Sequence, residues 1–375
     1  MSDTKQIQKE NQIKDIGAIP VFFILSRPRT GSTLLRTLFD AHPNIQIPPE
    51  CQFIVNLHPK YGKRNYWNHD NILEFVDDLE KQFLFDSWKL DIEKLKDSLT
   101  RLAGPLDYAT LCKAVYLHYQ SLFAKGKIFW IGDKNPGYAL YIEQLRSIFP
   151  DAKFIHLTRD YRDNYHSLAR VEFELPIISL TTYKWKYFYR KITSAAEQLS
   201  DDFTTIRYED LVKQPETEMK RLCQFLGIDY DPGILRFHEK RDEFLKIYPE
   251  AMVNRIHASL MHPVSDNKTG IWRTKLSERE IRIADYVVGT YGQMAGYDKQ
   301  FAGKEVDVKL AAMPGILLAR SIYLATRIVN RLPYKRRQYI LSELPFVLGR
   351  FWKQYLAKPS AKNGAGNGNA SHPIQ

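Results

Sequence analysis

The stretch PVFFILSRPRTGSTLLRTLFDA, residues 20–41, constrains the fold of this chain more than any other segment. Residues 20–26 are almost continuously apolar and too few for a surface helix. They predict a strand that is covered on both faces, as in a parallel sheet. A short polar turn around Gly31 follows. Residues 32–41 then have the apolar spacing of a helix, which a His-Pro pair ends. The chain therefore contains a buried strand that turns directly into a helix.

The same alternation of strands and helices continues through much of the chain. Further apolar strands are expected at residues 127–132, 152–158 and 203–208. This order predicts an α/β fold of the P-loop-like, three-layer kind, in which a mostly parallel central sheet is flanked by helices. Ligands of such sheets bind at the carboxyl ends of the strands, where the polar motifs of this chain begin. Helical patterns are expected at residues 108–124, 138–149 and 210–227.

The turn after the first strand is similar to a phosphate-binding loop, but it lacks the lysine of that motif. Against the pattern G-x-x-x-x-G-K-[ST], Gly31 matches the second glycine and Thr33 the last position, whereas Ser32 replaces the lysine. The unpaired N–H groups at the start of a helix still suit an anion. Because no lysine reaches toward a third phosphate, the loop is not suited to cleaving a triphosphate.

Two arginines before the glycine indicate which anion the loop holds. The guanidinium groups of Arg27 and Arg29 suit planar, bidentate contact with a sulfate or a phosphate. The loop is therefore predicted to bind a terminal anionic group that is transferred without hydrolysis of a triphosphate. An ordinary tight turn between strand and helix is the alternative. The predicted site is completed by the backbone amides of Thr30, Gly31, Ser32 and Thr33.

A second candidate anion site lies in KFIHLTRDYRDNYHSLARV, residues 153–171. Arg159 follows the carboxyl end of a predicted strand, and Ser167 lies about two helical turns further on. The two side chains could therefore close on one phosphate from two sides. The alternative is that Arg159 pairs with a neighbouring carboxylate and that Ser167 is a solvated helix residue.

Together these motifs resemble the sulfotransferase family, which uses 3′-phosphoadenosine 5′-phosphosulfate (PAPS) as donor. RPRTGSTLLR is similar to its 5′-phosphosulfate loop, and LTRDYRDNYHSL to its 3′-phosphate motif. Residues 206–228 and 270–277 resemble two later motifs of the family. The resemblance extends over about residues 20–295. It is closest to the branch with tyrosylprotein sulfotransferases and many bacterial enzymes, on residues 28–50.

The resemblance implies three catalytic residues. It carries the catalytic glutamate of the branch onto Glu50, which would act as general base on an acceptor hydroxyl. Lys134 corresponds to a family lysine that would stabilise the leaving group, and Arg29 would hold the sulfuryl oxygens. Read alone, Glu50 is a surface glutamate in a proline turn and Lys134 a solvated lysine. His58 is a reserve candidate for the base.

The resemblance also implies further nucleotide contacts. Tyr208 is similar to the family's adenine-side tyrosine, although a core aromatic residue is an equal alternative. The late R-K-G triplet of small-molecule members is absent, and residues 265–267 stand in its place. Lys268 and Arg273 are the candidate substitutes for that 3′-phosphate contact.

The acceptor is predicted to carry a hydroxyl group, and a hydrophobic alcohol such as a lipid or sterol, or a phenol, is the proposed class. The basis is a group of aromatic residues expected on the acceptor side, either as pocket lining or as helix core. The segment 172–190, rich in Tyr, Phe and Trp, belongs to the same prediction. The earlier aromatic residues are Phe53, Tyr61, Tyr66, Trp67, Phe83, Phe85 and Trp88.

The net charge of +11 suggests an anionic partner, and the nucleotide donor is the simplest one. Two other functions fit parts of the pattern: a nucleotide-dependent kinase, which Ser32 disfavours, and a basic nucleic-acid-binding module, for which no reader motif is present. No nucleic-acid partner is therefore expected. No metal is expected either, because His, Cys and carboxylates do not cluster at ligand spacing.

The chain is predicted to be cytoplasmic. Its three widely spaced cysteines make no disulfide framework, its N-terminus has no signal-peptide core, and no run of 18 uncharged apolar residues indicates a membrane span. Residues 306–357 mix apolar residues with Arg and Lys, so they either pack on the domain or dock peripherally on the inner membrane surface. The predicted parts are a flexible N-terminus (1–18), a sulfotransferase domain (19–300), a basic helical extension (301–358) and a disordered tail (359–375).

Overall fold

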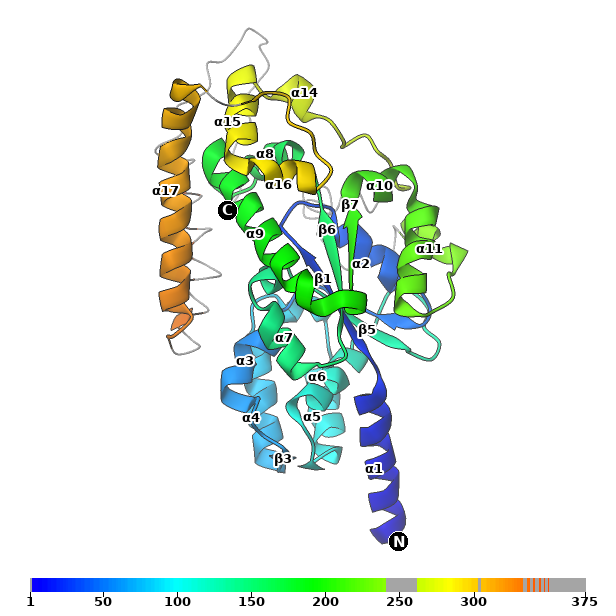
Figure 1. Ribbon diagram of the computed structural model, residues 1–375. Coiled ribbons are helices and arrows are strands. Elements are labelled where there is room, and N and C mark those ends of the chain that lie inside the picture. The colour runs from blue at the N-terminus through cyan, green and yellow to red at the C-terminus, as the bar shows by residue number, and fades with distance from the viewer. Residues whose placement is uncertain are drawn as a thin grey trace, which may run out of the picture.

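The computed structural model describes residues 2–240, 262–302 and 305–332, together with residues 336, 337, 340, 344, 347 and 350. Its centre is a five-stranded parallel sheet with the strand order β2-β5-β1-β6-β7 (Figure 1). The predicted α/β fold with a parallel central sheet is thereby confirmed. The strands of this sheet are β1 (Val21–Ser26), β2 (Ile45–Gln46), β5 (Trp130–Lys134), β6 (Lys153–Thr158) and β7 (Phe203–Arg207).

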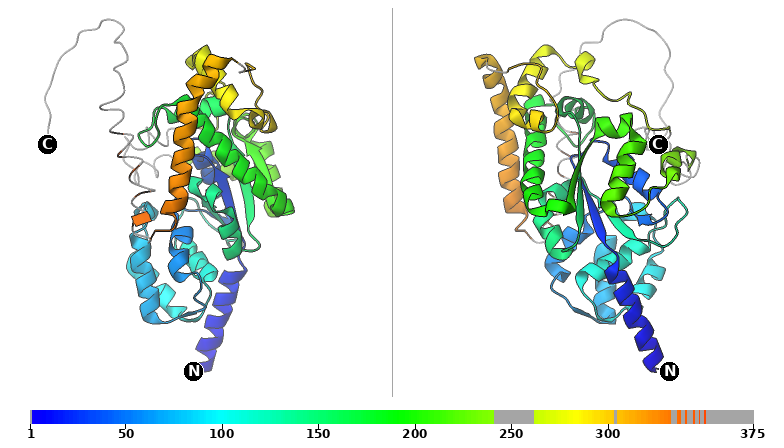
Figure 2. Two further views of the ribbon diagram at one scale, coloured as in Figure 1. Left: turned by 60° about the vertical axis from the view of Figure 1, so that its left-hand side comes forward. Right: turned by 45° about the vertical axis from the view of Figure 1, so that its right-hand side comes forward.

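Helices cover both faces of the sheet, which gives the three layers expected from the sequence (Figure 2). One face is covered by α2 (Ser32–Asp40), α10 (Tyr208–Lys213), α11 (Pro215–Leu226) and the 3₁₀ helix η4 (Pro232–Lys240). The other face is covered by η2 (Pro136–Leu140), α7 (Ile142–Ile148) and α9 (Ile178–Leu199), while α8 (Tyr161–Leu168) and η3 (Ser200–Asp202) pack on α9.

Strand β1 is apolar from Val21 to Leu25 because it lies between these two layers. Phe22 and Ile24 point into the cluster built with α2, α10 and α11. Phe23 and Leu25 point to the opposite face, into a cluster that α7 and α9 share. Successive side chains of a strand alternate between faces, so a strand buried on both sides is apolar at almost every position, and here only the last residue, Ser26, is polar.

A helical block is inserted between β2 and β5, and it lies beside one end of the sheet in Figure 1. Its short strands β3 (Tyr66–Trp67) and β4 (Gly104–Pro105) pair antiparallel. The block adds α3 to α6 to the hydrophobic core that Phe23 and Leu25 enter. Its helices are α3 (Phe53–Tyr61), α4 (His69–Glu80), η1 (Phe85–Trp88), α5 (Ile92–Arg101) and α6 (Tyr108–Leu117).

Three expectations for the elements need correction. The N-terminus, expected to be flexible, forms helix α1 (Ser2–Ala18), whose Ile13 and Ile16 pack against the core. The helix expected over residues 108–124 ends at Leu117. The helix expected over 210–227 is divided before Pro215, because proline has no N–H to continue the ladder.

The C-terminal part adds helices to the side of the domain where α9 lies. They are α14 (Trp272–Lys275), α15 (Glu278–Val288), α16 (Thr290–Met294) and α17 (Val306–Val329). α17 runs along the edge of the molecule, beside α9 and α15 (Figure 1). The predicted extension is thus helical over residues 306–329. Most of residues 334–357 and the whole tail 359–375 lie outside the described residues.

Within the described part of the chain, one helix is long and apolar enough to cross a membrane, by length and composition only. This helix is α17. The sequence criterion of 18 uncharged apolar residues excluded it, because Lys309, Arg320 and Arg327 interrupt the apolar run. In the structure, α17 packs on the domain along one of its sides.

Candidate functional site

The loop between β1 and α2 has the backbone conformation of an anion-binding nest. Arg29 and Gly31 both adopt left-handed φ angles, 66° and 91°. The first helical hydrogen bond of α2 runs from the Leu35 amide to the Gly31 carbonyl, so the amides before Leu35 have no acceptor within the helix. Backbone N–H groups arranged in this way form a concave site for an anion at a positive helix end.

Gly31 is required in this loop for two reasons. Its φ of 91° is costly for any residue with a Cβ. In addition, a Cβ at this position would overlap the ring of Tyr208, which packs against the glycine. Tyr208 is buried, and its pKa is raised by desolvation. Tyr208, which was predicted on the adenine side, therefore packs directly against the anion loop at Gly31.

The two reacting groups inferred from the sequence lie next to each other. Lys134, at the end of β5, forms an ion pair with Glu50, and its ammonium also lies 3.4 Å from the hydroxyl of Thr33 in α2. The Lys134 side chain is only 2% exposed, whereas that of Glu50 is 35% exposed. The carboxylate is therefore the member of the pair that an incoming molecule can reach.

The second predicted motif meets the same loop. The Nε of Arg29 donates to the hydroxyl of Ser167 over 3.1 Å, and Arg159 donates to the carbonyl oxygens of Arg29 and Lys268 over 3.0 and 2.6 Å. β1 and β6 are neighbours in the sheet, so the segments after them meet at its carboxyl edge. The structure thus brings together Arg29, Arg159, Ser167 and Lys268.

The cations of this cluster repel one another. Burial lowers the pKa of Arg29, and the charges of Arg159 and Arg170 lower it further. The pKa of Lys268 is lowered first by desolvation and then by Arg29, Arg159 and Arg170. A bound anion would relieve this repulsion. The buried Nε of Arg159, which has no hydrogen-bond partner in the described structure, is a donor still available to such an anion.

Two predicted nucleotide contacts are engaged elsewhere. Arg27 is buried, and its guanidinium donates to the carbonyl of Thr181 and pairs with Glu174 at 3.1 Å, which ties the loop to the start of α9. The guanidinium of Arg273 lies over the ring of Trp272 at 4.3 Å. Neither side chain has a described contact with the cluster around Arg159.

The loop that carries Lys268 is fixed by a carboxylate of α8. Asp163 accepts hydrogen bonds from the backbone amides of Gly270 and Trp272 over 2.7 and 2.9 Å. Burial raises its pKa, and these two bonds oppose the shift. Asp163 therefore holds the late sequence motif against the segment that bears Arg159 and Ser167.

Sequence reasoning missed Arg170 and Asp133. Arg170 follows Ser167 by three residues, the helical spacing that would have placed it on the same side. Asp133 is fully buried beside Lys134, and burial raises its pKa to about 7 although Tyr116 and Asn135 donate to it. No motif signalled Asp133, because its partner Tyr116 lies in the inserted block.

The histidines have structural surroundings. His58 lies in α3 with its ring against Tyr108, and burial lowers its pKa. His42 bonds the backbone of Asp229, as expected for a structural residue. His156 is buried in β6, and desolvation lowers its pKa to about 3.

The aromatic residues expected to line an acceptor pocket lie mostly in the core. Tyr66 and Phe83 are the exposed members of the group. The alternative stated for the sequence, helix core, therefore describes most of them. The buried members, all in the cluster that also holds Phe23, are Phe53, Tyr61, Trp67, Phe85 and Trp88.

Comparisons with known proteins identify the family of this chain. The sequence model described as "Sulfotransferase family" matches residues 20–232, which is 213 of the 375 residues. A putative protein-tyrosine sulfotransferase of Caenorhabditis briggsae is 26% identical over 229 residues, which cover 58% of this chain and 69% of that protein.

Two solved structures are also similar. The sulfotransferase domain of the Synechococcus PCC 7002 olefin synthase covers 74% of this chain and 95% of its own, with 22% identity and a TM-score of 0.49. A retinol dehydratase in complex with androsterone and the inactive cofactor PAP covers 78% of this chain and 87% of its own, with 17% identity and a TM-score of 0.32. Because the family model matches more than half of the chain, this chain belongs to the sulfotransferase family and is an enzyme of that class.

Proposed function

We propose that the protein transfers the sulfuryl group of PAPS to an acceptor hydroxyl, with Glu50 as general base and Lys134 at the leaving group. The observation that carries the proposal is the Glu50–Lys134 ion pair, which lies against Thr33 at the start of α2. The base, the lysine and the anion loop thereby meet at one point, although they are far apart in the sequence. Membership of the sulfotransferase family disfavours the kinase and the nucleic-acid-binding alternatives.

The residues around the loop fit the nucleotide. PAPS would supply an activated sulfuryl group and, on its ribose, a second anionic group. The amides of residues 30–33 and Arg29 would hold the phosphosulfate end. Arg159, Ser167 and Lys268 would hold the 3′-phosphate. The mutual repulsion of the cations and the unpartnered Nε of Arg159 support this assignment.

Glu50 and Lys134 have separate roles in this step: Glu50 accepts a proton, and Lys134 stabilises the developing negative charge. Glu50 takes the proton of the acceptor hydroxyl as that oxygen bonds to sulfur. The bond between sulfur and the bridging phosphate oxygen breaks at the same time, and the ammonium of Lys134 meets the charge that develops on that oxygen. The nearby hydroxyl of Thr33 keeps the ammonium at the loop.

The acceptor class that we propose is a hydrophobic alcohol, such as a lipid or a sterol. The support for this class is the exposed apolar side of α17. α17 packs on α9, and the carbonyl of Thr181 in α9 accepts a hydrogen bond from Arg27 of the anion loop, so this apolar side and the loop are connected through one helix. A screen with radiolabelled PAPS should compare sterol, lipid, phenol and tyrosine-peptide acceptors. Transfer to the peptide alone would overturn the proposal of a hydrophobic alcohol as acceptor, and it would leave the proposed sulfotransferase activity intact.

The substitution Glu50→Gln tests the base. It should lower the transfer rate about a hundredfold or more, because the amide cannot accept the proton. Binding of the desulfated nucleotide PAP, measured by calorimetry, should stay within about twofold, because the cation cluster is unchanged. Glu93→Gln, at a glutamate of α5 whose side chain is 84% exposed, is the matched control. Full transfer in Glu50→Gln would show that Glu50 is not the base. If the unaltered protein gave no heat with PAP, the proposal that PAPS is the donor would be wrong.

A further inference from the structure

The outer side of α17 is an apolar surface that nothing in the described structure covers. Five large apolar side chains with high exposed fractions lie on it, four or seven residues apart. Because an α-helix repeats every 3.6 residues, these spacings place them on one side of the helix. Their exposed fractions are 70% for Val306, 68% for Leu310, 51% for Leu317, 62% for Leu324 and 60% for Ile328.

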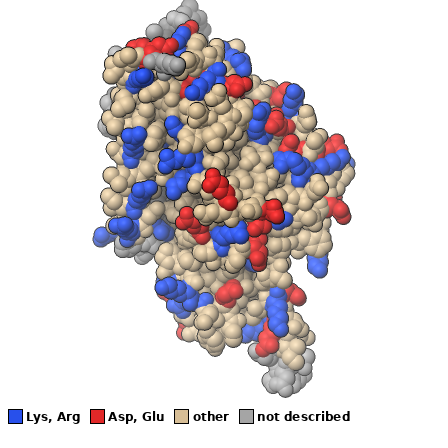
Figure 3. Space-filling view, in the orientation of Figure 1, with Lys and Arg blue, Asp and Glu red and all other residues tan. Residues whose placement is uncertain are grey.

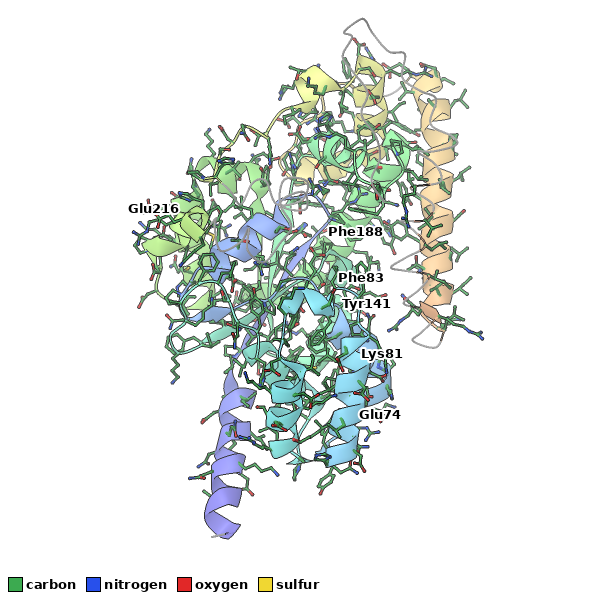
Figure 4. All side chains as sticks on the ribbon, turned by 180° about the vertical axis from the view of Figure 1, so that it is seen from behind. Glu74, Lys81, Phe83, Tyr141, Phe188 and Glu216 are labelled. Atoms are coloured by element: carbon green, nitrogen blue, oxygen red, sulfur yellow. The ribbon has the colours of Figure 1, made fainter. Side chains whose placement is uncertain are left out.

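The inner side of α17 packs closely on α9, so the helix already has its contact with the hydrophobic core. The exposed outer side is therefore a separate surface. Gly315 lies so close to α9 that a Cβ there would overlap the hydroxyl of Ser179 and come within 2.6 Å of the amide of Leu180. Tyr323 stacks on Tyr187 of α9 with ring centroids 3.8 Å apart. The buried residues of this side, which are small except for one valine, are Val308, Ala312, Gly315 and Ala319. Figure 4 shows side chains on the other side of α17 directed away from the domain.

Cationic residues accompany the apolar surface. At 100° per residue, Lys309, Arg320 and Arg327 fall along one border of it, and all of them are exposed. Arg331 follows just after the helix and is also exposed. Figure 3 shows Lys and Arg side chains along the edge of the molecule that α17 forms. Within α17, Asp307 at the N-terminal end is the only acidic residue.

We propose that α17 docks the protein on an anionic lipid bilayer, lying in the plane of the interface with its outer side in lipid. An apolar strip with cations along its border is complementary to acyl chains beneath anionic headgroups. A second copy of the same helix would offer only Asp307 to these cations. The helix lies in the interface rather than crossing the bilayer, because its inner side is seated on α9 and α15.

Docking through α17 would place the anion loop close to the membrane. Ser179, which receives Gly315 of α17, lies two residues from Thr181, whose carbonyl accepts a hydrogen bond from Arg27. A short stretch of α9 therefore joins the docking helix to the loop after β1. The docking proposal does not depend on the identity of the donor or the acceptor.

Co-sedimentation of the full chain with vesicles tests the proposal. Phosphatidylcholine vesicles with phosphatidylglycerol should bind the protein, vesicles of phosphatidylcholine alone should bind it far more weakly, and added salt should release it. The triple variant Leu310→Glu, Leu317→Glu, Leu324→Glu should reduce binding about tenfold or more. The control is Met294→Glu with Phe129→Glu, at two exposed apolar residues outside α17, and it should bind as the unaltered protein does.

A charge variant keeps the test valid if the triple variant misfolds. Lys309→Gln with Arg327→Gln and Arg331→Gln leaves the apolar surface intact and should weaken binding about fivefold for each cation removed. Circular dichroism and thermal unfolding report the folding of each variant. Equal binding to neutral vesicles, unchanged binding of both variants, or retention through an alkaline carbonate wash would overturn the proposal. So would a stable dimer that the leucine variant dissociates without any vesicle binding.

Discussion

At the residue scale, Lys134 is unusual because its ammonium is almost completely buried. It pairs with the more exposed Glu50 and lies beside Thr33, so its surroundings are set by the reacting centre rather than by solvent. Lys134→Ala should lower kcat about a hundredfold, because it removes charge stabilisation that matters most in the transition state. PAP affinity should change less than about threefold. Steady-state kinetics and calorimetry measure the two quantities.

The control for Lys134 is Lys60→Ala, at a lysine that is paired with Asp78 and Glu74 on the inserted block. It should leave kcat unchanged. If Lys134→Ala instead weakened PAP binding and preserved kcat, Lys134 would be a nucleotide anchor with no part in the chemical step.

Most of the candidate site could be predicted from the sequence, because its residues follow the ends of strands that are neighbours in a parallel sheet. Arg29 and Glu50 follow the ends of β1 and β2, Lys134 is the last residue of β5, and the structure brings all of them to one edge. Arg27 could not be placed in this way. Arg27 is buried and pairs with Glu174, a partner that the loop sequence does not indicate. The catalytic roles themselves stay predictions.

At the element scale, the loop before α14 lacks the R-K-G triplet of small-molecule sulfotransferases and is held by contacts with Asp163 and Arg159. Asp163 of α8 binds two amides of the loop, and the carbonyl of Lys268 receives Arg159. Asp163→Asn puts an N–H₂ group where one carboxylate oxygen accepted, so one of the two bonds is lost. PAP affinity should fall about three- to tenfold, measured by calorimetry, because Lys268 is then less well placed.

Asp266→Asn is the control in the same loop, since Asp266 is exposed and accepts hydrogen bonds from Thr269 through its backbone oxygen. It should not weaken PAP binding. An Asp163→Asn variant with unaltered affinity would show that the attachment of the loop does not matter for the nucleotide.

Element boundaries were less predictable than element type. The strands were expected within a few residues of their observed ends, because apolar runs mark burial directly. α1 was missed because its sequence is polar, and only tertiary contacts of Ile13 and Ile16 with the core show why it forms a helix there. The early end of α6 has no Gly or Pro signal in the sequence.

At the scale of the whole molecule, one buried histidine should make stability depend on pH. The folded-state pKa of His156 is about 3 because of desolvation, against 6.5 for the free side chain. Below pH 6.5 the unfolded chain therefore binds a proton that the folded chain does not, so this stabilisation is lost as pH falls toward 3. The loss is about 1.4 kcal/mol per pH unit in that window.

His156→Phe should remove this dependence. Urea unfolding at pH 7.5 and pH 5 should show a smaller fall in unfolding free energy for the variant than for the unaltered protein, by about 2 kcal/mol. His69→Gln, at a histidine whose side chain is 67% exposed, should behave as the unaltered protein does. Equal falls in the His156 variant and the unaltered protein would mean that the folded protein protonates His156 readily.

The α/β class of the molecule could be predicted from composition and order alone, but the position of its last helix could not. Residues 306–329 have an apolar outer side and a seated inner side, and one sequence pattern serves both. Which side faces the domain depends on the small residues that permit close approach to α9, and the sequence does not name that partner.

Glu50 lies between β2 and the first helix of the inserted block, and Lys134 is the last residue of β5, the strand that follows the block. The ion pair between these residues therefore links the segment before the block to the strand after it. Changes inside the block that leave both of these segments in place would keep the ion pair beside Thr33. On the function proposed above, a different acceptor would then call for changes within the block and not at the anion loop.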